Sequence, residues 1–267
     1  MKKVIVTQPI YYPLSLSAAK EHLRVDHTAD DAYISTLIGV ATLKAESYLR
    51  RKLITQTWQY FLDHWPHENY ITIPFGQLNS ITHIKYTDID GTTNTDFDED
   101  DEWTEDNDSD PGRAVLSYGE TYPTASLATN NPIEIQFVCG YGAHTPKIIT
   151  AATNATPIVA TIASHGYVTG NEVYINGGTT QTSINGLWRI TKINDNSFSP
   201  TGSSGNGVYD ASSATCNLVD VPPSIIHAMQ LIISDLYAQR ETLIVNMTPH
   251  KLNTVENLLY PYRLWEF

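Results

Sequence analysis

The sequence lacks the features that mark secreted and membrane-spanning proteins. Only two cysteines, Cys139 and Cys216, occur among its 267 residues, which excludes a disulfide framework and indicates synthesis in a reducing cytoplasm. No apolar run approaches the ~20 residues that a membrane-spanning helix needs. The apolar run Val4–Val6 is too short for the core of a signal peptide. We therefore expect no membrane partner.

Catalytic and cofactor-binding motifs are missing as well. The sequence has no GxSxG, no GxxxxGK and no GxGxxG, the patterns that present a nucleophile or cradle a phosphate. Ser203 lies in a glycine-rich turn without the spacing of a nucleophile elbow. A triad can also assemble from residues far apart in the chain, so a hydrolase stays open as an alternative. Because no residue indicates it, we expect no enzyme activity and no cofactor.

Basic residues are few. The chain has 16 Lys and Arg against 29 Asp and Glu, a net charge of −13. Binding to a phosphate backbone needs clustered cations, so a surface that coats DNA or RNA is not expected. Ten acidic residues lie between Asp96 and Asp110, and removing ten negative charges from −13 leaves −3. Most of the acidity is therefore one local feature.

This acidic run has two interpretations. An EF-hand register starting at Asp96 places Asp98 and Asp100 correctly, but Asp101 and Asn107 stand where the motif needs Gly and Glu. A solvated acidic loop is therefore favoured. In a ring-shaped assembly, its charge would keep DNA from adhering to a channel wall. The residues that we expect to face such a channel are Asp98, Glu99, Asp100, Asp101 and Glu102.

Two further site hypotheses rest on few residues. His64, His67 and Glu68 suggest zinc, but Pro66 separates the histidines, and no HExxH or paired CxxC accompanies them. A metal site is therefore not favoured. The two cysteines could pair with each other, although buried free thiols are the favoured interpretation.

Apolar spacing predicts four helices. Ser15 or Ser17 can cap the first, and the positive charge of Arg50-Arg51-Lys52 suits the end of the second. Two prolines suit the start of the third. The expected helices are residues 14–23, a longer one with an apolar stripe from Ile34 to Leu49, one from Pro222 through Arg240, and one from about Pro249 to Leu259.

Strands are expected between the second and third helices. The alternating segments are Thr57–Leu62, Tyr70–Ile73, Ile81–Tyr86 and Ile133–Val138. Residues 146–218 differ in composition, because they hold eight of the 15 glycines and no helical stripe. Short strands alternate there with Gly and Asn turns, at Ile158–Ile162, Glu172–Ile175, Leu187–Ile193 and Ser197–Phe198. This pattern is typical of a small all-β barrel.

The order of motifs resembles the head–tail connector (neck adaptor) proteins of long-tailed bacteriophages. The matching motifs are Pro13-Leu14-Ser15-Leu16, Asp30-Asp31, Ile54-Thr55-Gln56-Thr57-Trp58, Pro111-Gly112-Arg113, Gly140-Tyr141-Gly142, Val221-Pro222-Pro223-Ser224-Ile225 and Tyr262-Arg263. The resemblance covers about residues 1–145 and 219–267. It implies a ring, of twelve copies in register with a portal, that also contacts a head-completion or tail-terminator protein and lets DNA pass.

Residues 146–218 separately resemble a β-barrel module of phage virion proteins named after a half-domain of ubiquitin-activating enzymes. The matching stretches are Asn154–Val159, Ser164-His165-Gly166, Gly170–Val173, Ile184–Trp188, Asn196–Phe198 and Gly202–Gly207. Together the two resemblances predict an α+β fold. It comprises a four-helix adaptor core with an antiparallel β region between helices 2 and 3, formed by residues 1–145 and 219–267, and an inserted small all-β barrel.

The C-terminal segment is aromatic and has two interpretations of equal weight. It either packs on the last helix or anchors an interface, since aromatic residues with an Arg are typical of interface hot spots. Adaptors of the resembled family use this segment to grip the portal. The corresponding residues here are Tyr260, Tyr262, Arg263, Leu264, Trp265 and Phe267.

The sequence thus predicts a structural adaptor, made in the bacterial cytoplasm and located in the neck of the virion. A second hypothesis is a virion surface protein that binds glycan through the inserted barrel. Trp188, Tyr167 and Tyr174 could stack on sugar rings, although core packing explains such aromatics more often. Deletion of residues 146–218 discriminates between the two, because an adaptor should still assemble without them.

Overall fold

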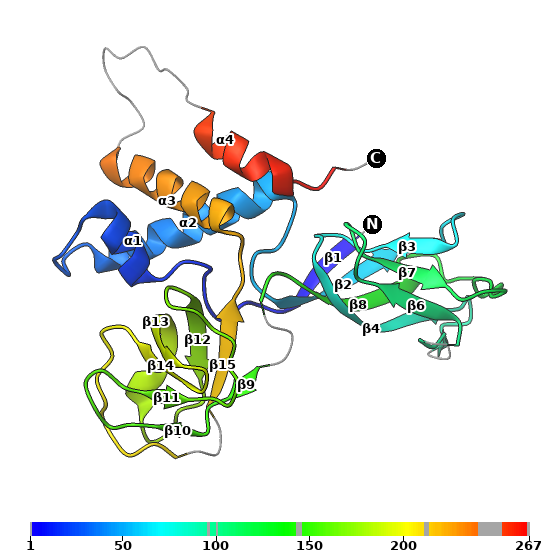
Figure 1. The fold of residues 1–267 in the computed structure, drawn as a ribbon. Helices are drawn as coiled ribbons and strands as arrows, with labels where there is room; N and C mark the ends of the chain where they lie inside the picture. Colours follow the sequence, from blue (N-terminus) through cyan, green and yellow to red (C-terminus); the bar gives the residue numbers. More distant parts are fainter. Residues whose placement is uncertain are drawn as a thin grey trace, which may run out of the picture. The chain divides into compact units, whose positions relative to one another are not determined.

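The computed structural model of the protein describes residues 2–94, 97–99, 101–142, 146–210, 214–239 and 253–265. The chain forms two compact units (Figure 1). The first consists of Met1–Ile10, Glu46–Tyr141 and Tyr262–Phe267, and the second of Tyr11–Ala45 and Gly142–Pro261. Sheets dominate the first unit, whereas the second contains most of the helical residues and a further sheet. The α+β class is confirmed.

Helices occur at the four places where apolar spacing predicts them. Within the described ranges they are α1 (Leu16–Leu23), α2 (Asp31–Leu49), α3 (Pro223–Ala238) and α4 (Thr254–Leu259), with short 3₁₀ turns η1 (Thr182–Ile184) and η2 (Tyr260–Tyr262). Ser15 caps α1, because its Oγ accepts a hydrogen bond from the Ala18 N–H at 3.2 Å. Arg50 takes a left-handed conformation with φ 56° and ends α2. The expected start of the last helix near Pro249 lies outside the described residues.

Antiparallel pairing organises the first unit. Its larger sheet has the order β1-β2-β8-β4-β5, and its smaller one the order β3-β7-β6. The strands are β1 (Lys2–Thr7), β2 (Gln56–Leu62), β3 (Tyr70–Thr72), β4 (Leu78–Thr87), β5 (Thr93–Asn94), β6 (Trp103–Asp106), β7 (Arg113–Leu116) and β8 (Ile133–Cys139). Alternate residues of β8 point into the core, where Ile133, Ile135, Phe137 and Cys139 are fully buried.

The second unit contains a seven-stranded antiparallel sheet in the order β10-β11-β14-β13-β12-β15-β9. Its strands are β9 (Lys147–Ile148), β10 (Ala151–Ala152), β11 (Ala160–Thr161), β12 (Glu172–Asn176), β13 (Gly186–Asn194), β14 (Ser197–Pro200) and β15 (Thr215–Val219). They form a half-barrel around a core that includes Ile158, Val173 and Phe198. The half-barrel and the helices α1 and α3 belong to the same compact unit, so a boundary at residues 146 and 218 remains a prediction.

The two ends of the half-barrel are neighbours. Strand β9 pairs with β15, and the register places Lys147 opposite Cys216. Paired strands lie about 5 Å apart, so the chain enters and leaves this sheet at nearly one point. A short linker can therefore replace the whole stretch without stretching the flanking chain.

Candidate functional site

The C-terminal segment Tyr262–Trp265 is bound to the first unit by backbone hydrogen bonds. The Leu264 N–H donates to the carbonyl of Leu49, the last residue of α2, at 2.9 Å. Arg51 Nε donates to the carbonyl of Tyr262. Both bonds use main-chain atoms of the segment, so they fix the path of its backbone.

Arg51 is the residue that organises this contact. Its guanidinium is buried, and Nη2 forms an ion pair with Asp110. Gly76 approaches the same group: a Cβ at this glycine would lie 2.6 Å from Arg51 Nη1 and 2.9 Å from Leu264 Cδ1. Gly76 also has φ +57°, a conformation that favours glycine. The Arg51 contact therefore depends on the absence of a side chain at Gly76.

Arg263 is held between two aromatic rings. Its guanidinium carbon lies 5.1 Å from the centre of the Tyr48 ring and 4.9 Å from that of Trp265. The Trp265 side chain is still 46% exposed. A half-exposed Trp stiffened by an Arg is typical of an interface anchor. The packing and the anchor interpretations of the segment are thus compatible in one arrangement.

The other predicted docking residues lie elsewhere. Tyr260, at the end of α4, belongs to the second unit and is 55% exposed. Phe267 lies outside the described residues. The structure therefore brings together four of the six predicted residues, namely Tyr262, Arg263, Leu264 and Trp265.

The predicted acidic loop is closed by two buried aromatic residues. Phe97 and Trp103 are both buried, and Trp103 Nε1 donates to the Phe97 carbonyl at 3.1 Å. Between them Asp98, Glu99 and Asp101 are exposed, whereas Asp100 lies outside the described residues. Glu102 is half-buried, and its carboxylate accepts the Asp98 N–H at 2.8 Å. The tip of this loop thus exposes three carboxylates, those of Asp98, Glu99 and Asp101.

Part of the acidic run is not a solvated loop, which corrects that expectation for Trp103–Asp106. Trp103–Asp106 form β6, because Trp103 buries its ring in the core and so fixes a strand register. Glu105 accepts the Ile81 N–H at 2.5 Å, and Asp110 pairs with Arg51. These carboxylates are engaged in contacts within the first unit.

Asp106 provides a pH test of this arrangement. Hydrogen bonds from Ser109 and the adjacent Arg113 guanidinium lower the pKa of Asp106 to about 2 from 3.8. Its stabilising contribution is present above the unfolded pKa and is lost as the pH falls from about 4 through about 2. In an NMR titration of the carboxyl carbon we expect a midpoint near pH 2. Ser109→Ala should move that midpoint upwards more than Arg113→Gln does, and an unshifted midpoint in both variants would contradict these contacts.

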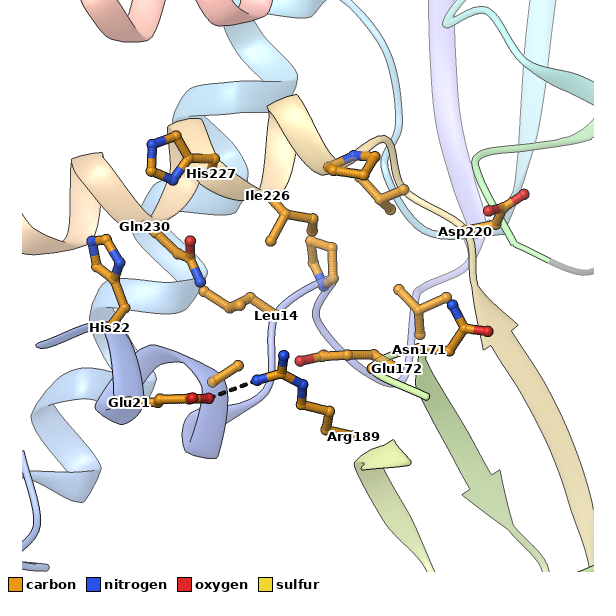
Figure 2. Close-up of a pocket in the computed structure, with 16 residues that line it drawn as sticks. Leu14, Glu21, His22, Asn171, Glu172, Arg189, Asp220, Ile226, His227 and Gln230 are labelled. Atoms are coloured by element: carbon orange, nitrogen blue, oxygen red, sulfur yellow. Dashed lines mark hydrogen bonds and ion pairs between the residues drawn. The ribbon is translucent and has the colours of Figure 1, made fainter. Parts of the chain in front are cut away.

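A cavity of about 520 Å³ lies in the second unit (Figure 2). Glu172 on β12 accepts hydrogen bonds from the N–H and Oγ of Ser15, at 3.1 and 3.0 Å, and burial raises the pKa of this carboxyl. Arg189 on β13 forms an ion pair with Glu21 of α1 at 2.7 Å. No Ser, Thr, Cys, Lys or Tyr side chain is among the described residues that line the cavity, whereas Glu21, Glu172 and Asp220 contribute carboxylates. Its polar contacts attach the half-barrel to α1.

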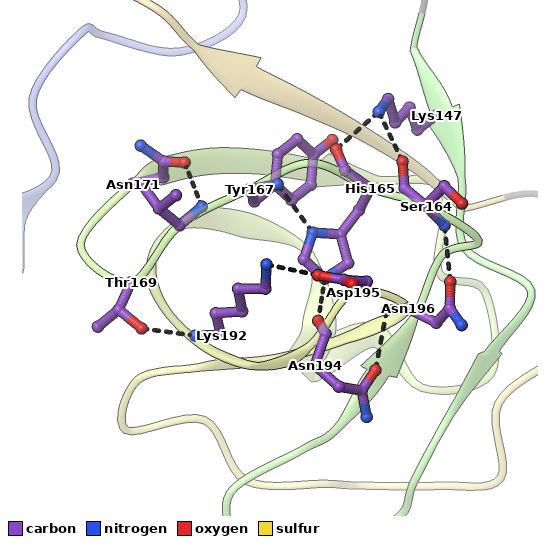
Figure 3. Close-up of polar contacts among 11 residues, drawn as sticks. Lys147, Ser164, His165, Tyr167, Thr169, Asn171, Lys192, Asn194, Asp195 and Asn196 are labelled. Atoms are coloured by element: carbon purple, nitrogen blue, oxygen red, sulfur yellow. Dashed lines mark hydrogen bonds and ion pairs between the residues drawn. The ribbon is translucent and has the colours of Figure 1, made fainter.

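His165 organises one end of the half-barrel (Figure 3). Its Nδ1 accepts the Tyr167 N–H and its Nε2 donates to the Asn194 carbonyl, both at 2.9 Å. These partners fix the neutral tautomer with the proton on Nε2. The ring is 1% exposed and stacks on Tyr167, and Lys147 Nζ donates to the His165 carbonyl at 2.7 Å. This histidine is a structural residue.

The aromatic residues proposed to stack on sugars are engaged within the second unit. Tyr167 is buried, and Tyr174 stacks on Tyr11 with ring centres 4.4 Å apart. Trp188 packs against the core, and its Nε1 donates to the Ile184 carbonyl at 2.7 Å. Core packing therefore accounts for Tyr167 and Trp188, and the contact with Tyr11 engages Tyr174.

The structure also bears on the hypotheses of a metal site and of a cysteine pair. No group of three or more His, Cys, Asp or Glu side chains suited to a metal ion occurs among the residues that the structure describes. His64 and His67 are exposed. Cys139 and Cys216 are buried free thiols, as favoured from the sequence, and burial raises the pKa of each to about 12.

Known proteins resemble this chain in sequence and in fold. Residues 13–111 match the family described as phage gp6-like head-tail connector protein. The resemblance to phage head–tail connectors is confirmed. No curated protein matches this sequence. None of its helices in the described ranges is both long and apolar enough to cross a membrane.

Three solved structures share the fold along the whole chain. They come from the neck of an empty gene transfer agent (GTA) particle computed with C6 symmetry, the virion of the native GTA particle, and the neck of the native particle computed with C12 symmetry. Their sequence identities are 15%, 16% and 16%, and their TM-scores 0.57, 0.57 and 0.54. Each match covers 100% of this chain and 97% of the other.

Proposed function

We propose that this chain is a structural, non-enzymatic adaptor in the neck of a phage or phage-like virion. Copies form a ring that joins the portal to the next head-completion or tail-terminator protein, and DNA passes through it. The observation that carries the proposal is the connector family match at residues 13–111 together with the full-length likeness to neck structures. The protein is made in the bacterial cytoplasm and ends in the virion.

A ring of twelve copies is the assembly that we propose. Support comes from the similar neck structure that was computed with C12 symmetry. A closed ring needs a head-to-tail contact, in which one surface of a subunit binds a different surface of its neighbour. Such an adaptor acts by joining neighbouring proteins, so it requires contact surfaces rather than a catalytic site.

Docking to the portal is assigned to the C-terminal residues Tyr260, Tyr262, Arg263, Leu264, Trp265 and Phe267. The half-exposed Trp265 ring, stiffened by Arg263, supports this assignment. Aromatic and Arg side chains carry most of the binding energy in many interfaces. Arg51 presents the segment by holding the Tyr262 carbonyl.

We further propose that the acidic loop faces the DNA passage. Its exposed residues Asp98, Glu99 and Asp101 would repel phosphate at short range. A reconstruction of the assembled ring with this loop on its outer surface would refute the assignment and leave the adaptor function standing.

Electron microscopy of the protein mixed with the portal ring from the same genome tests the proposal. We expect an added ring of density below the portal, lost on truncation of residues 260–267. The matched control is an alanine at exposed Val208, which lies in the second unit outside the C-terminal segment. If the protein at micromolar concentration does not bind the portal, and also fails to bind portals taken from DNA-filled heads, the proposed function is contradicted.

A further inference from the structure

Helix α2 presents an outer face that is unusually poor in charge. In the part of α2 that belongs to the second unit, the buried stripe is Ile34, Leu37, Ile38, Ala41 and Ala45. The exposed residues there are Ala32, Ser35, Thr36, Val40, Leu43 and Lys44. Only Lys44 among these is charged, whereas a helix face in contact with water commonly carries several charged side chains. This composition indicates a face that binds another surface.

Large apolar side chains gather on this face. Leu43 is 67% exposed, Tyr12 49% and Val40 43%. A Cβ at Gly39 would lie 3.1 Å from Tyr12 Oη, so the Tyr12 ring lies along the helix beside Val40. Leu43 is three residues further on the same side of the helix. Contiguous exposed apolar groups mark interaction sites more often than isolated ones do.

Burying the polar residues of this face costs little free energy. The Ser35 hydroxyl donates to the Asp31 carbonyl at 2.8 Å, and the Thr36 hydroxyl to the Ala32 carbonyl at 3.0 Å. Hydroxyl donors that are already bonded inside the helix lose less on leaving water than unbonded ones. The face can therefore be covered without leaving these donors unpaired.

Helix α3 presents a face that complements it. Asp235 is the only charged residue between Pro223 and Ala238 apart from the histidine, and it is exposed. Its neighbours on the same side are Leu231, Ser234 and Ala238, and the Ser234 hydroxyl donates to the Gln230 carbonyl at 3.0 Å. Both faces are thus weakly polar with one charge each, Lys44 on α2 and Asp235 on α3, and the two charges have opposite sign.

The two faces belong to one unit and are separate surfaces of it. Tyr33 Oη on α2 donates to the Leu236 carbonyl on α3 at 3.3 Å, and Tyr237 Oη lies 2.6 Å from Asp30 Oδ2. These contacts hold the two helices together on their inner sides. Two unlike, complementary surfaces on one subunit are what a head-to-tail contact requires. Similar chains occur in necks computed with C6 and C12 symmetry.

We propose that the outer face of α2 docks on the outer face of α3 in a second copy of this chain, with Lys44 opposite Asp235. This contact rests on the proposed ring-forming function and specifies which surfaces join its subunits. The apolar residues Tyr12, Val40 and Leu43 supply the buried area, and the charge pair fixes the register.

Cross-linking of a Lys44→Cys, Asp235→Cys double variant with a short bismaleimide tests the contact. We expect a ladder of covalent multimers in portal-bound protein and in concentrated free protein, and no multimers from either single variant. The native thiols give little background because they are buried and their pKa values are raised to about 12. Absence of a ladder, or equal cross-linking by a single variant, would overturn the head-to-tail contact.

Charge reversal gives a second, independent measurement. By sedimentation we expect Leu43→Glu to weaken self-association by roughly 100-fold and Lys44→Glu by about tenfold. Adding Asp235→Lys to Lys44→Glu should restore the association, whereas Val208→Glu, at another exposed apolar residue, should leave it unchanged. If wild-type protein binds portals while these variants associate normally, the contact fails and the function stands. If wild-type protein never joins portals, the function fails whatever the cross-linking shows.

Discussion

Arg51→Ala is expected to free the C-terminal segment and to reduce binding to the portal ring by roughly 100-fold. The buried guanidinium donates to the Tyr262 carbonyl and pairs with Asp110. Loss of a hydrogen bond from a charged group costs about 1.5–3 kcal/mol, and 1.4 kcal/mol corresponds to a factor of ten. Hydrogen exchange at Leu264 measures the release directly, because its N–H donates to the Leu49 carbonyl. Surface plasmon resonance on immobilised portals measures the binding.

Two further variants separate the contacts of Arg51. Asp110→Asn removes the ion pair and keeps the bond to Tyr262, and we expect a small effect because the Asp110 side chain is 54% exposed. Gly76→Val retains the Arg51 residue but should displace its guanidinium, because a Cβ at position 76 lies 2.6 Å from Arg51 Nη1. It should therefore reproduce the effect of Arg51→Ala. If Leu264 exchanges at the wild-type rate in both Arg51→Ala and Gly76→Val, the segment is held by other contacts.

Local patterns in the sequence predicted the helices well, because each signal lies in the helix or directly beside it. The Ser15 cap and the Pro222-Pro223 start involve only neighbouring residues. Strand β1 was missed, because Val4–Val6 is a short apolar run whose stability comes from pairing with β2 more than 50 residues away. Trp103 shows a signal that was available: a large aromatic inside an acidic run indicates an anchored strand rather than a solvated loop.

The sequence supplied the candidate residues of the C-terminal segment but not the contacts that hold the segment in place. An aromatic C-terminus with an Arg favours an anchor, which stays a prediction; Trp265 is half-exposed. The sequence interpretation of Arg51 was a helix-end charge, which follows from the dipole alone. Its bond to Tyr262 joins residues 211 positions apart, and no local pattern encodes such a contact. The same holds for Glu172, which reaches the cap residue Ser15 from 157 positions away.

Replacing residues 146–218 by a short glycine linker is expected to preserve ring assembly on the portal and to lower the melting temperature by roughly 5–15 °C. The linker can close because Lys147 lies opposite Cys216. Stability falls because Ser15 loses the Glu172 carboxylate, Tyr11 loses its stacking partner Tyr174, and Glu21 loses Arg189. Differential scanning fluorimetry and electron microscopy with portals provide the two readouts.

Glu172→Ala isolates one of these contacts and should account for about 1–3 kcal/mol of the loss, because the Ser15 N–H and hydroxyl are left without their acceptor. Glu172→Gln is the matched control, since it keeps the volume and one acceptor oxygen. A deletion variant that melts like the wild type would show that these contacts contribute no stability. A deletion variant that stays folded but no longer forms rings would place the subunit contact on the half-barrel. The proposed α2–α3 contact would then be wrong. The interpretation of residues 146–218 as an addition to an adaptor that is complete without them would also be wrong.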